Sequence, residues 1–239
     1  MRQCVYCREK FPQTQITRDH VIASSWYPKS TPPKVQRITA LSCKHCNTTR
    51  YSANERYLLL RLSACVDPGV PESEGVWEHA QRAMDASLAP DEREREHRQA
   101  AWDALAADTM KIDRPPDVGL LPSFASNFDL GSRMSIRIQS EKLNSVIEKW
   151  GLGIHSHIWK KPAAIDAEIT VLQIDALDAR ELLQGAEGHW KTIDRGPGIQ
   201  IRYVSGCGGD ERFTLYEFTI WERFVAYAAI REYQLDSAR

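Results

Sequence analysis

Residues 4–47, CVYCREKFPQTQITRDHVIASSWYPKSTPPKVQRITALSCKHCN, decide the fold of this chain. Two Cys-x-x-Cys pairs, Cys4 with Cys7 and Cys43 with Cys46, begin the stretch and nearly end it. Thiolates are good ligands for tetrahedral zinc, and a two-residue spacer lets both sulfurs of a pair reach one ion while the chain turns. The sequence therefore predicts a structural zinc site on these four cysteines.

A redox-active site and unrelated thiols are the alternative interpretations. A thioredoxin-like Cys-x-x-Cys lies between a strand and a helix and needs no second pair, whereas here two pairs of the same form are 35 residues apart. Zinc is therefore favoured.

The remaining cysteines, Cys65 and Cys207, form no even disulfide framework, which indicates a reducing compartment. No apolar leader or run of about 20 apolar residues occurs, so we expect a cytoplasmic protein without a membrane partner.

The charge of the chain is distributed unevenly. The chain has 239 residues, of which 42% are hydrophobic, enough for one large or two small domains. Residues 1–62 contain 11 Lys and Arg against 3 acidic residues, whereas the rest contains 20 basic and 29 acidic residues. We therefore expect a polyanion such as nucleic acid to bind the N-terminal part. A basic surface that is only solvated is the alternative.

Residues 1–62 form the first of three predicted segments. Their β-branched residues predict strands at residues 15–22 and 35–41. The residues after the second cysteine pair predict a helix, with Ser52 and Glu55 as a capping box. The expected order is therefore a cysteine pair, two strands, a second cysteine pair and a helix.

Residues 63–113 and 114–239 complete the predicted α+β fold. The first of these is an expected helical connector, since residues 67–113 contain 12 acidic and 5 basic residues. The second alternates between strand and helix patterns, which predicts a small α+β domain with a regulatory, specificity or dimerisation role. We expect strands at residues 134–138, 169–174, 199–204 and 213–220, and helices at residues 141–150 and 178–183.

Asp19 and His20 lie between the cysteine pairs, and Asn47 directly follows the second pair. Hydrolysis of a phosphodiester needs a deprotonated water and a cation that neutralises charge on the phosphorane. Imidazole can accept a proton near neutral pH, and Mg²⁺ or Mn²⁺ prefers oxygen ligands. Neighbouring residues of a strand face opposite sides, so Asp19 can hold metal while His20 reaches water from another direction, provided that the strand bends there.

Together these motifs resemble the HNH, or ββα-metal, endonucleases, and within them the zinc-clipped subgroup similar to phage recombination endonuclease VII. The residues that carry the resemblance are Cys4-x-x-Cys7, Asp19-His20-Val21-Ile22 and Cys43-x-x-Cys46-Asn47. The resemblance implies an N-terminal ββα-metal, treble-clef-like module over residues 1–62. It also implies that DNA is cut to 5′-phosphate and 3′-hydroxyl ends.

The resemblance further implies a role for each motif residue. His20 is the expected general base, and Asp19 and Asn47 are the expected ligands of one catalytic Mg²⁺ or Mn²⁺. Structural zinc on the four cysteines is expected to hold the hairpin and the helix together. Members also carry a middle Asn in the second strand that braces the catalytic loop, but residues 37–40 of this chain are Arg-Ile-Thr-Ala.

Several other polar residues carry weaker signals. His45 is expected to be exposed. His155 and His157 lie two apart in a strand-like, Gly-rich segment, and without a further ligand nearby we interpret them as structural. Basic residues near the motifs are predicted to contact nucleic-acid phosphates. They are Arg18, Arg37, Lys44, Arg50 and Arg56.

Two other functions remain open. A non-catalytic zinc module that binds nucleic acid or protein needs the same cysteines but gives no reason for Asp19-His20 or Asn47. An RNA-directed HNH nuclease uses the same phosphate and metal chemistry as a DNA enzyme. DNA is the favoured partner, with a homodimer or a regulatory protein as a further partner of the C-terminal part. The resemblance to this class suggests phage defence or a mobile element as the setting.

Overall fold

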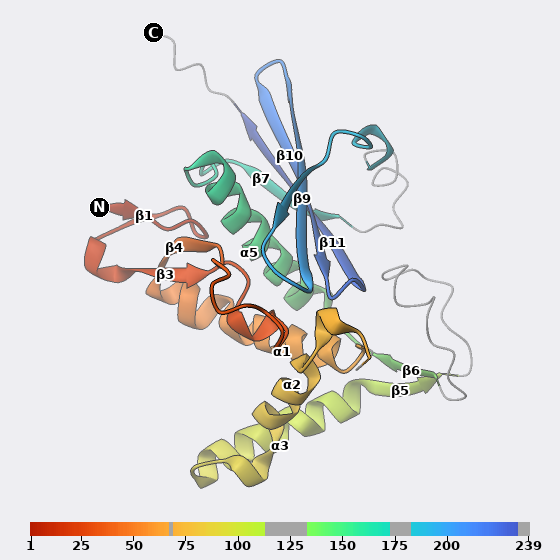
Figure 1. Cartoon of the computed structure of the whole chain (residues 1–239). Helices are drawn as coiled ribbons and strands as arrows, with labels where there is room; N and C mark the ends of the chain where they lie inside the picture. The colour runs from red at the N-terminus through yellow and green to blue at the C-terminus, as the bar shows by residue number, and fades with distance from the viewer. Residues whose placement is uncertain (67–68, 113–132, 173–182, 234–239) are drawn as a thin grey trace.

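A computed structural model describes residues 1–66, 69–112, 133–172 and 183–233, which form a mixed α+β fold (Figure 1). The predicted α+β class is confirmed. The N-terminal elements are the strands β1 (Arg2–Gln3), β2 (Lys10–Phe11), β3 (Ile16–His20) and β4 (Thr39–Cys43), the 3-10 turns η1 (Gln13–Gln15) and η2 (Ser24–Trp26), the π-helical turn η3 (Cys46–Arg50) and helix α1 (Ser52–Ser63).

Strands β3 and β4 form an antiparallel hairpin that leads into α1. Ile16 pairs with Cys43 and His20 with Thr39, so the hairpin ends where the Asp19-His20 dipeptide lies. Helix α1 follows after η3, in the order that the sequence predicted. The capping box is wrong: the Ser52 hydroxyl donates to the Thr48 carbonyl at 2.7 Å, and no side chain caps the start of the helix.

The acidic segment is helical, as predicted. It contains η4 (Pro71–Ser73), α2 (Val76–Met84), η5 (Ala86–Leu88) and α3 (Glu92–Asp108), and in Figure 1 α3 lies far from the large sheet. The Asp91 carboxylate caps α3 by accepting a hydrogen bond from the Glu94 amide at 2.8 Å. Strand β5 (Thr109–Ile112) leaves α3 and pairs with β6 (Arg133–Ile136).

No helix among the described residues is long and apolar enough to span a membrane.

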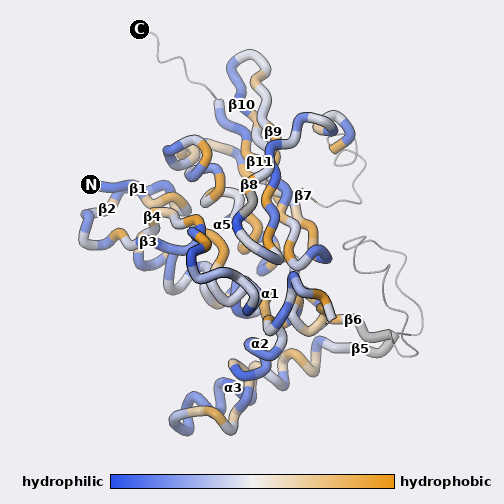
Figure 2. The backbone as a smooth tube through the Cα atoms, viewed as in Figure 1, coloured by the Kyte–Doolittle hydropathy of each residue, from blue (hydrophilic) through white to orange (hydrophobic). Residues whose placement is uncertain are grey.

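The C-terminal half combines one long helix, α5, with an antiparallel sheet of five strands. The strand order in this sheet is β7-β11-β10-β9-β8. Figure 2 shows hydrophobic stretches within the sheet. Strands β8 and β11 were not expected from the sequence, whereas β6, β7, β9 and β10 overlap predicted strands. The bounds are α5 (Ser140–Trp159), β7 (Glu168–Leu172), β8 (Lys191–Asp194), β9 (Ile199–Gly208), β10 (Glu211–Ile220) and β11 (Phe224–Tyr233).

Helix α5 extends nine residues beyond the predicted end at residue 150. His155 and His157 therefore lie on a helix, and the prediction of a strand-like segment is wrong. Gly151 and Gly153 weakened the helical pattern, yet both lie where α5 approaches its neighbours closely. The predicted helix at residues 178–183 lies almost wholly outside the described residues.

One hydrophobic core contains residues from both halves of the chain, from Cys4 to Ile230. At its centre the Trp26 ring stacks on Trp221 with centroids 5.4 Å apart, and it meets Trp150 edge-on at 5.0 Å. The Trp221 indole also donates to the Trp26 carbonyl at 2.8 Å. Helix α5 therefore packs between the β3–β4 hairpin and the sheet, as Figure 1 shows. The predicted domain boundaries stay predictions.

Candidate functional site

The four cysteines of the two pairs form one cluster. Their sulfur atoms all lie within 4.8 Å of one another, and the Sγ atoms of Cys7 and Cys43 are 4.0 Å apart. Zinc–sulfur bonds of about 2.3 Å in a tetrahedron place sulfurs about 3.8 Å apart, so the cluster has nearly the required size. The predicted grouping is confirmed, and these cysteines could hold a metal ion such as zinc.

The electrostatics of the cluster also suit a cation. A hydrogen bond from Cys46 lowers the pKa of the Cys4 thiol to about 4, whereas burial raises the pKa of Cys7 to about 11. The hydrogen bond to Cys4 raises the pKa of Cys46 strongly. Neighbouring sulfurs therefore compete for one negative charge. A divalent ion between them would stabilise several thiolates at once.

The first cysteine pair is held in place by the hairpin of β1 and β2 and by Arg8. Arg8 adopts a positive φ of 65°, and its carbonyl accepts a hydrogen bond from the Gln3 amide at 2.7 Å. Its guanidinium donates to the carbonyls of Ala164 and Ala167 at 2.9 and 3.0 Å. The cysteine cluster is thus connected to the segment that leads from α5 into the sheet.

Asp19 faces the interior of the protein. Its Oδ2 lies 3.0 Å from the Nζ of Lys149 on α5, and the same ammonium donates to Oε2 of Glu55 at 2.8 Å. Burial raises the pKa of the Glu55 carboxyl, and Lys149 partly opposes this shift. Burial raises the pKa of the Tyr6 phenol well above its usual range, and the charge of Asp19 adds to that shift. Asp19 therefore has a basic partner that was not predicted from the sequence.

His20 is exposed at the last position of β3, where the strand pleat turns it away from the face that carries Asp19. Thr39 pairs with it across the hairpin. The His20 carbonyl is held from the inside by a hydrogen bond from Lys149 Nζ at 3.1 Å. The His20 imidazole is thus exposed, whereas the backbone carbonyl of the same residue is hydrogen-bonded on the interior side.

Asn47 lies beside β3, although its hydrogen bond is to Thr17 and not to Asp19. The Asn47 amide donates to the Thr17 hydroxyl at 3.0 Å. Thr17 and Asp19 are two residues apart and share one face of the strand, about 6.6 Å from each other along it. The structure therefore brings Asn47 to the face of β3 that carries Asp19, at a position two residues before Asp19.

The predicted phosphate contacts differ in exposure and in their partners. Arg18, Lys44 and Arg50 are exposed, and so is His45, as expected. Three of the five basic residues have partners within the protein. Arg37 lies over the Tyr27 ring at 4.9 Å, Arg50 forms a 3.5 Å ion pair with Glu148, and Arg56 donates to the Ala83 carbonyl at 3.2 Å.

His155 and His157 have structural partners. His155 is buried, with Nδ1 at 2.7 Å from the Tyr216 hydroxyl and Nε2 at 3.3 Å from a Glu232 oxygen. Burial lowers its pKa to about 4. His157 lies 3.1 Å from the Arg195 guanidinium. Their interpretation as structural residues agrees with these contacts.

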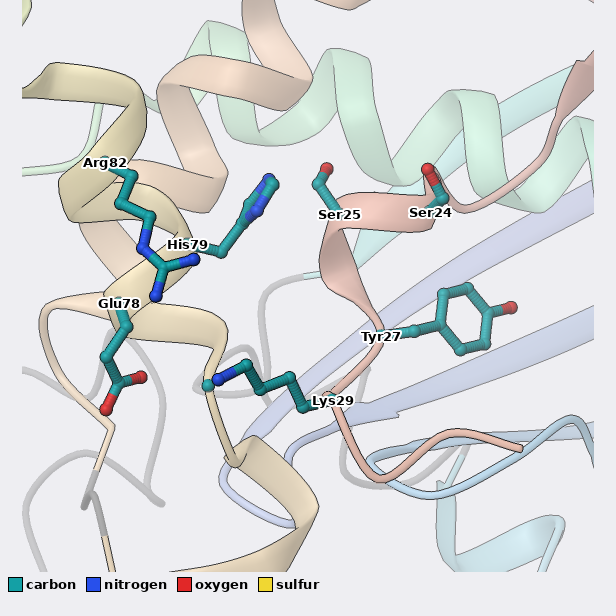
Figure 3. Close-up of a pocket in the computed structure, with 8 residues that line it drawn as sticks. Ser24, Ser25, Tyr27, Lys29, Glu78, His79 and Arg82 are labelled. Atoms are coloured by element: carbon teal, nitrogen blue, oxygen red, sulfur yellow. The ribbon is translucent and has the colours of Figure 1, made fainter. Parts of the chain in front are cut away.

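A polar pocket of about 200 Å³ lies beside the turn that follows His20. In Figure 3, side chains from the η2 region and from α2 face one another across it. This pocket was not predicted, because the segment that contains α2 was expected to be a helical connector. Its lining residues are Ser24, Ser25, Tyr27, Lys29, Gly75, Glu78, His79 and Arg82.

Lys149 and the inward orientation of Glu55 are the features of the site that sequence reasoning missed. One signal was present: Lys149 interrupts the apolar positions Val146 and Trp150, both of which are buried. A lone charge in the apolar face of a helix indicates a buried partner. Glu55 offered no comparable signal, because it also suits a helix cap.

No protein-family model, curated protein or solved structure matches this chain. Its chemistry is therefore inferred from its own residues. They combine a four-cysteine cluster, an exposed histidine beside a partly buried aspartate, and an asparagine on the aspartate's face of the strand.

Proposed function

We propose that this protein is a metal-dependent HNH endonuclease that hydrolyses phosphodiester bonds of DNA. The observation that carries the proposal is the arrangement around β3. His20 is exposed at the strand end, and Asp19 and Asn47 lie along one face. Structural zinc on the four cysteines would hold β4 and η3 against the N-terminal hairpin.

The residues around β3 match the steps of hydrolysis. The His20 imidazole would take a proton from the attacking water as a new P–O bond forms. The bond from phosphorus to the 3′ oxygen would break and that oxygen would take a proton from solvent, which leaves a 5′-phosphate and a 3′-hydroxyl. Asp19 and Asn47 would hold Mg²⁺ or Mn²⁺ through carboxylate and amide oxygens. The bound ion would neutralise charge on the phosphorane and the leaving oxygen.

A non-catalytic zinc module that binds nucleic acid is the second candidate. The observation that favours it is the ion pair between Asp19 and Lys149, which engages one carboxylate oxygen inside the protein. The exposed Arg18 and Lys44 would serve either function, since both require contact with phosphates.

Nicking of supercoiled plasmid with Mg²⁺ or Mn²⁺ tests the proposal. His20→Ala should lower the rate by about 100-fold or more, the usual contribution of a general base, while zinc content and melting temperature stay near those of the wild type. His45→Ala is the matched control, because His45 is exposed in the same module and should cut normally.

Parallel reactions on plasmid, single-stranded DNA and RNA separate the candidates. Cutting confined to RNA would favour the RNA-directed enzyme. Binding without cutting of any substrate would favour the non-catalytic module. Undiminished cutting by His20→Ala would exclude His20 as the base.

A further inference from the structure

The ammonium of Lys149 contacts both residues of the Asp19-His20 dipeptide. Its Nζ lies 3.1 Å from the His20 carbonyl oxygen and 3.0 Å from Asp19 Oδ2, and a third contact of 2.8 Å reaches Glu55 Oε2. Hydrogen bonds join Nζ to the His20 carbonyl and to Glu55, and the contact with the Asp19 carboxylate is an ion pair. Only 2% of the side chain is exposed.

Burial of this lysine calls for an explanation. Lysine is almost never fully buried unless it is paired, and an apolar residue of similar volume often stabilises a core at least as well. The neighbours of Lys149 along α5 are of that apolar kind, since Val146, Ile147 and Trp150 are all inaccessible to solvent. Packing alone therefore does not explain a lysine at this position.

Helix α5 holds the ammonium at a fixed position. A Cβ added at Gly153 would lie 2.6 Å from both methyl groups of Val21, the residue that follows His20. On another side, a Cβ at Gly151 would lie 3.0 Å from Ala228 of β11. The backbone of α5 is thus closely packed between the His20 loop and the sheet.

The contact to His20 also bears on the asparagine that is missing from the second strand. Residues 37–40 lack the asparagine that would brace this loop from the second strand in the family that the motifs resemble. In this chain the loop is joined to that strand by a main-chain bond of 3.0 Å from Val21 to Ile38, and the side-chain bond comes from Lys149. One ammonium therefore holds the peptide of the proposed base and orients the carboxylate beside it.

We propose that Lys149 is a positioning residue of the nuclease site, which makes α5 a part of that site. The inference rests on the proposed function. Lys149 pairs with Oδ2 of Asp19, so the other carboxylate oxygen would be the one available to a catalytic ion. Placement matters here, because a displacement of about 1 Å can cost about 100-fold in rate.

The test compares Lys149→Met with the double variant Lys149→Met/Glu55→Gln. The single variant leaves the buried Glu55 and the partly buried Asp19 without a counter-charge. The double variant removes one carboxylate together with the ammonium, so the net charge of the cluster is unchanged. We expect the double variant to recover melting temperature and zinc content, because the cluster then has the net charge of the wild type and only one carboxylate lacks a counter-charge.

Plasmid nicking by the double variant should nevertheless stay impaired. We expect kcat to fall about 10- to 100-fold at nearly unchanged KM, and the Mg²⁺ concentration for half-maximal rate to rise, because neither the His20 peptide nor Asp19 is held. Lys142→Met, the same change two turns earlier on α5, is the matched control and should cut normally. A folded double variant with wild-type kcat and Mg²⁺ dependence would overturn the inference.

Two further outcomes are informative. If the double variant does not fold, Lys149→Arg takes its place, since arginine keeps the charge but cannot present one nitrogen to three acceptors. A folded Lys149→Arg chain with full kcat would equally overturn the inference. A wild-type protein without metal-dependent cutting would instead overturn the proposed function.

Discussion

Replacement of Gly153 by alanine should destabilise the protein, although alanine is the better helix former. The added Cβ would lie 2.6 Å from Cγ1 and Cγ2 of Val21 and 3.1 Å from its Cβ. Val21 is fully buried, and a β-branched side chain has little rotamer freedom with which to move aside. The helix or the loop must therefore shift by about 1 Å to restore ordinary contact distances.

Two opposing effects set the magnitude. Overpacking of a core costs about 1–3 kcal/mol, whereas alanine in place of a helical glycine gains about 0.5–1 kcal/mol. Overpacking should win, and the free energy of unfolding should fall by about 1–2 kcal/mol. For a chain of this length, the melting temperature should then fall by about 2–8 °C.

Thermal and urea unfolding followed by circular dichroism measure the effect. Gly206→Ala is the control, because a Cβ there would have no atom within 4 Å. Val21→Ala removes the two clashing methyl groups, so its combination with Gly153→Ala should cost less than the sum of the two single changes. A Gly153→Ala chain that melts at or above the wild-type temperature would refute the close packing of α5 against the loop.

Two further predictions concern the cysteine cluster and the buried histidine. Purified protein should contain about one tightly bound zinc, and Cys43→Ser should lose it together with much of the N-terminal fold; metal analysis that finds no zinc in the wild type would contradict the site. The pKa of His155 is lowered to about 4 by burial. Unfolded imidazole binds a proton below about 6.5, so His155 should cost stability as pH falls from about 6.5 to about 4, and urea titrations of His155→Gln should show a shallower decline.

Local patterns predicted the cysteine cluster and the β3–β4 hairpin. Both cysteine pairs carry their ligand spacing within four residues, and strand patterns need only a short run of alternating side chains. Asp19, His20 and Asn47 were singled out by their place relative to those pairs. Their surroundings were not predictable in the same way, since Asp19 turns inward to a lysine that is 130 residues further along the chain.

Long-range contacts explain the errors. Glu55 fits a helix cap on local grounds, but its carboxylate binds Lys149 across a separation of 94 residues. Gly151 and Gly153 suggested an end to the helix, because glycine is a poor helix former when nothing packs against it. Here Val21 and Ala228 require small residues at those positions, and only the folded structure reveals these neighbours.

The stacked rings of Trp26 and Trp221 limit how this protein can be divided into fragments. Expressed alone, residues 1–62 would expose the Trp26 indole and the apolar side chains around it. The fragment would also leave Asp19 and Glu55 without a counter-charge. We expect such a fragment to aggregate even when zinc is supplied. The shortest stable piece that keeps His20 must therefore include α5 and the strands that lead to Trp221, so the site cannot be transplanted with its cysteine cluster alone.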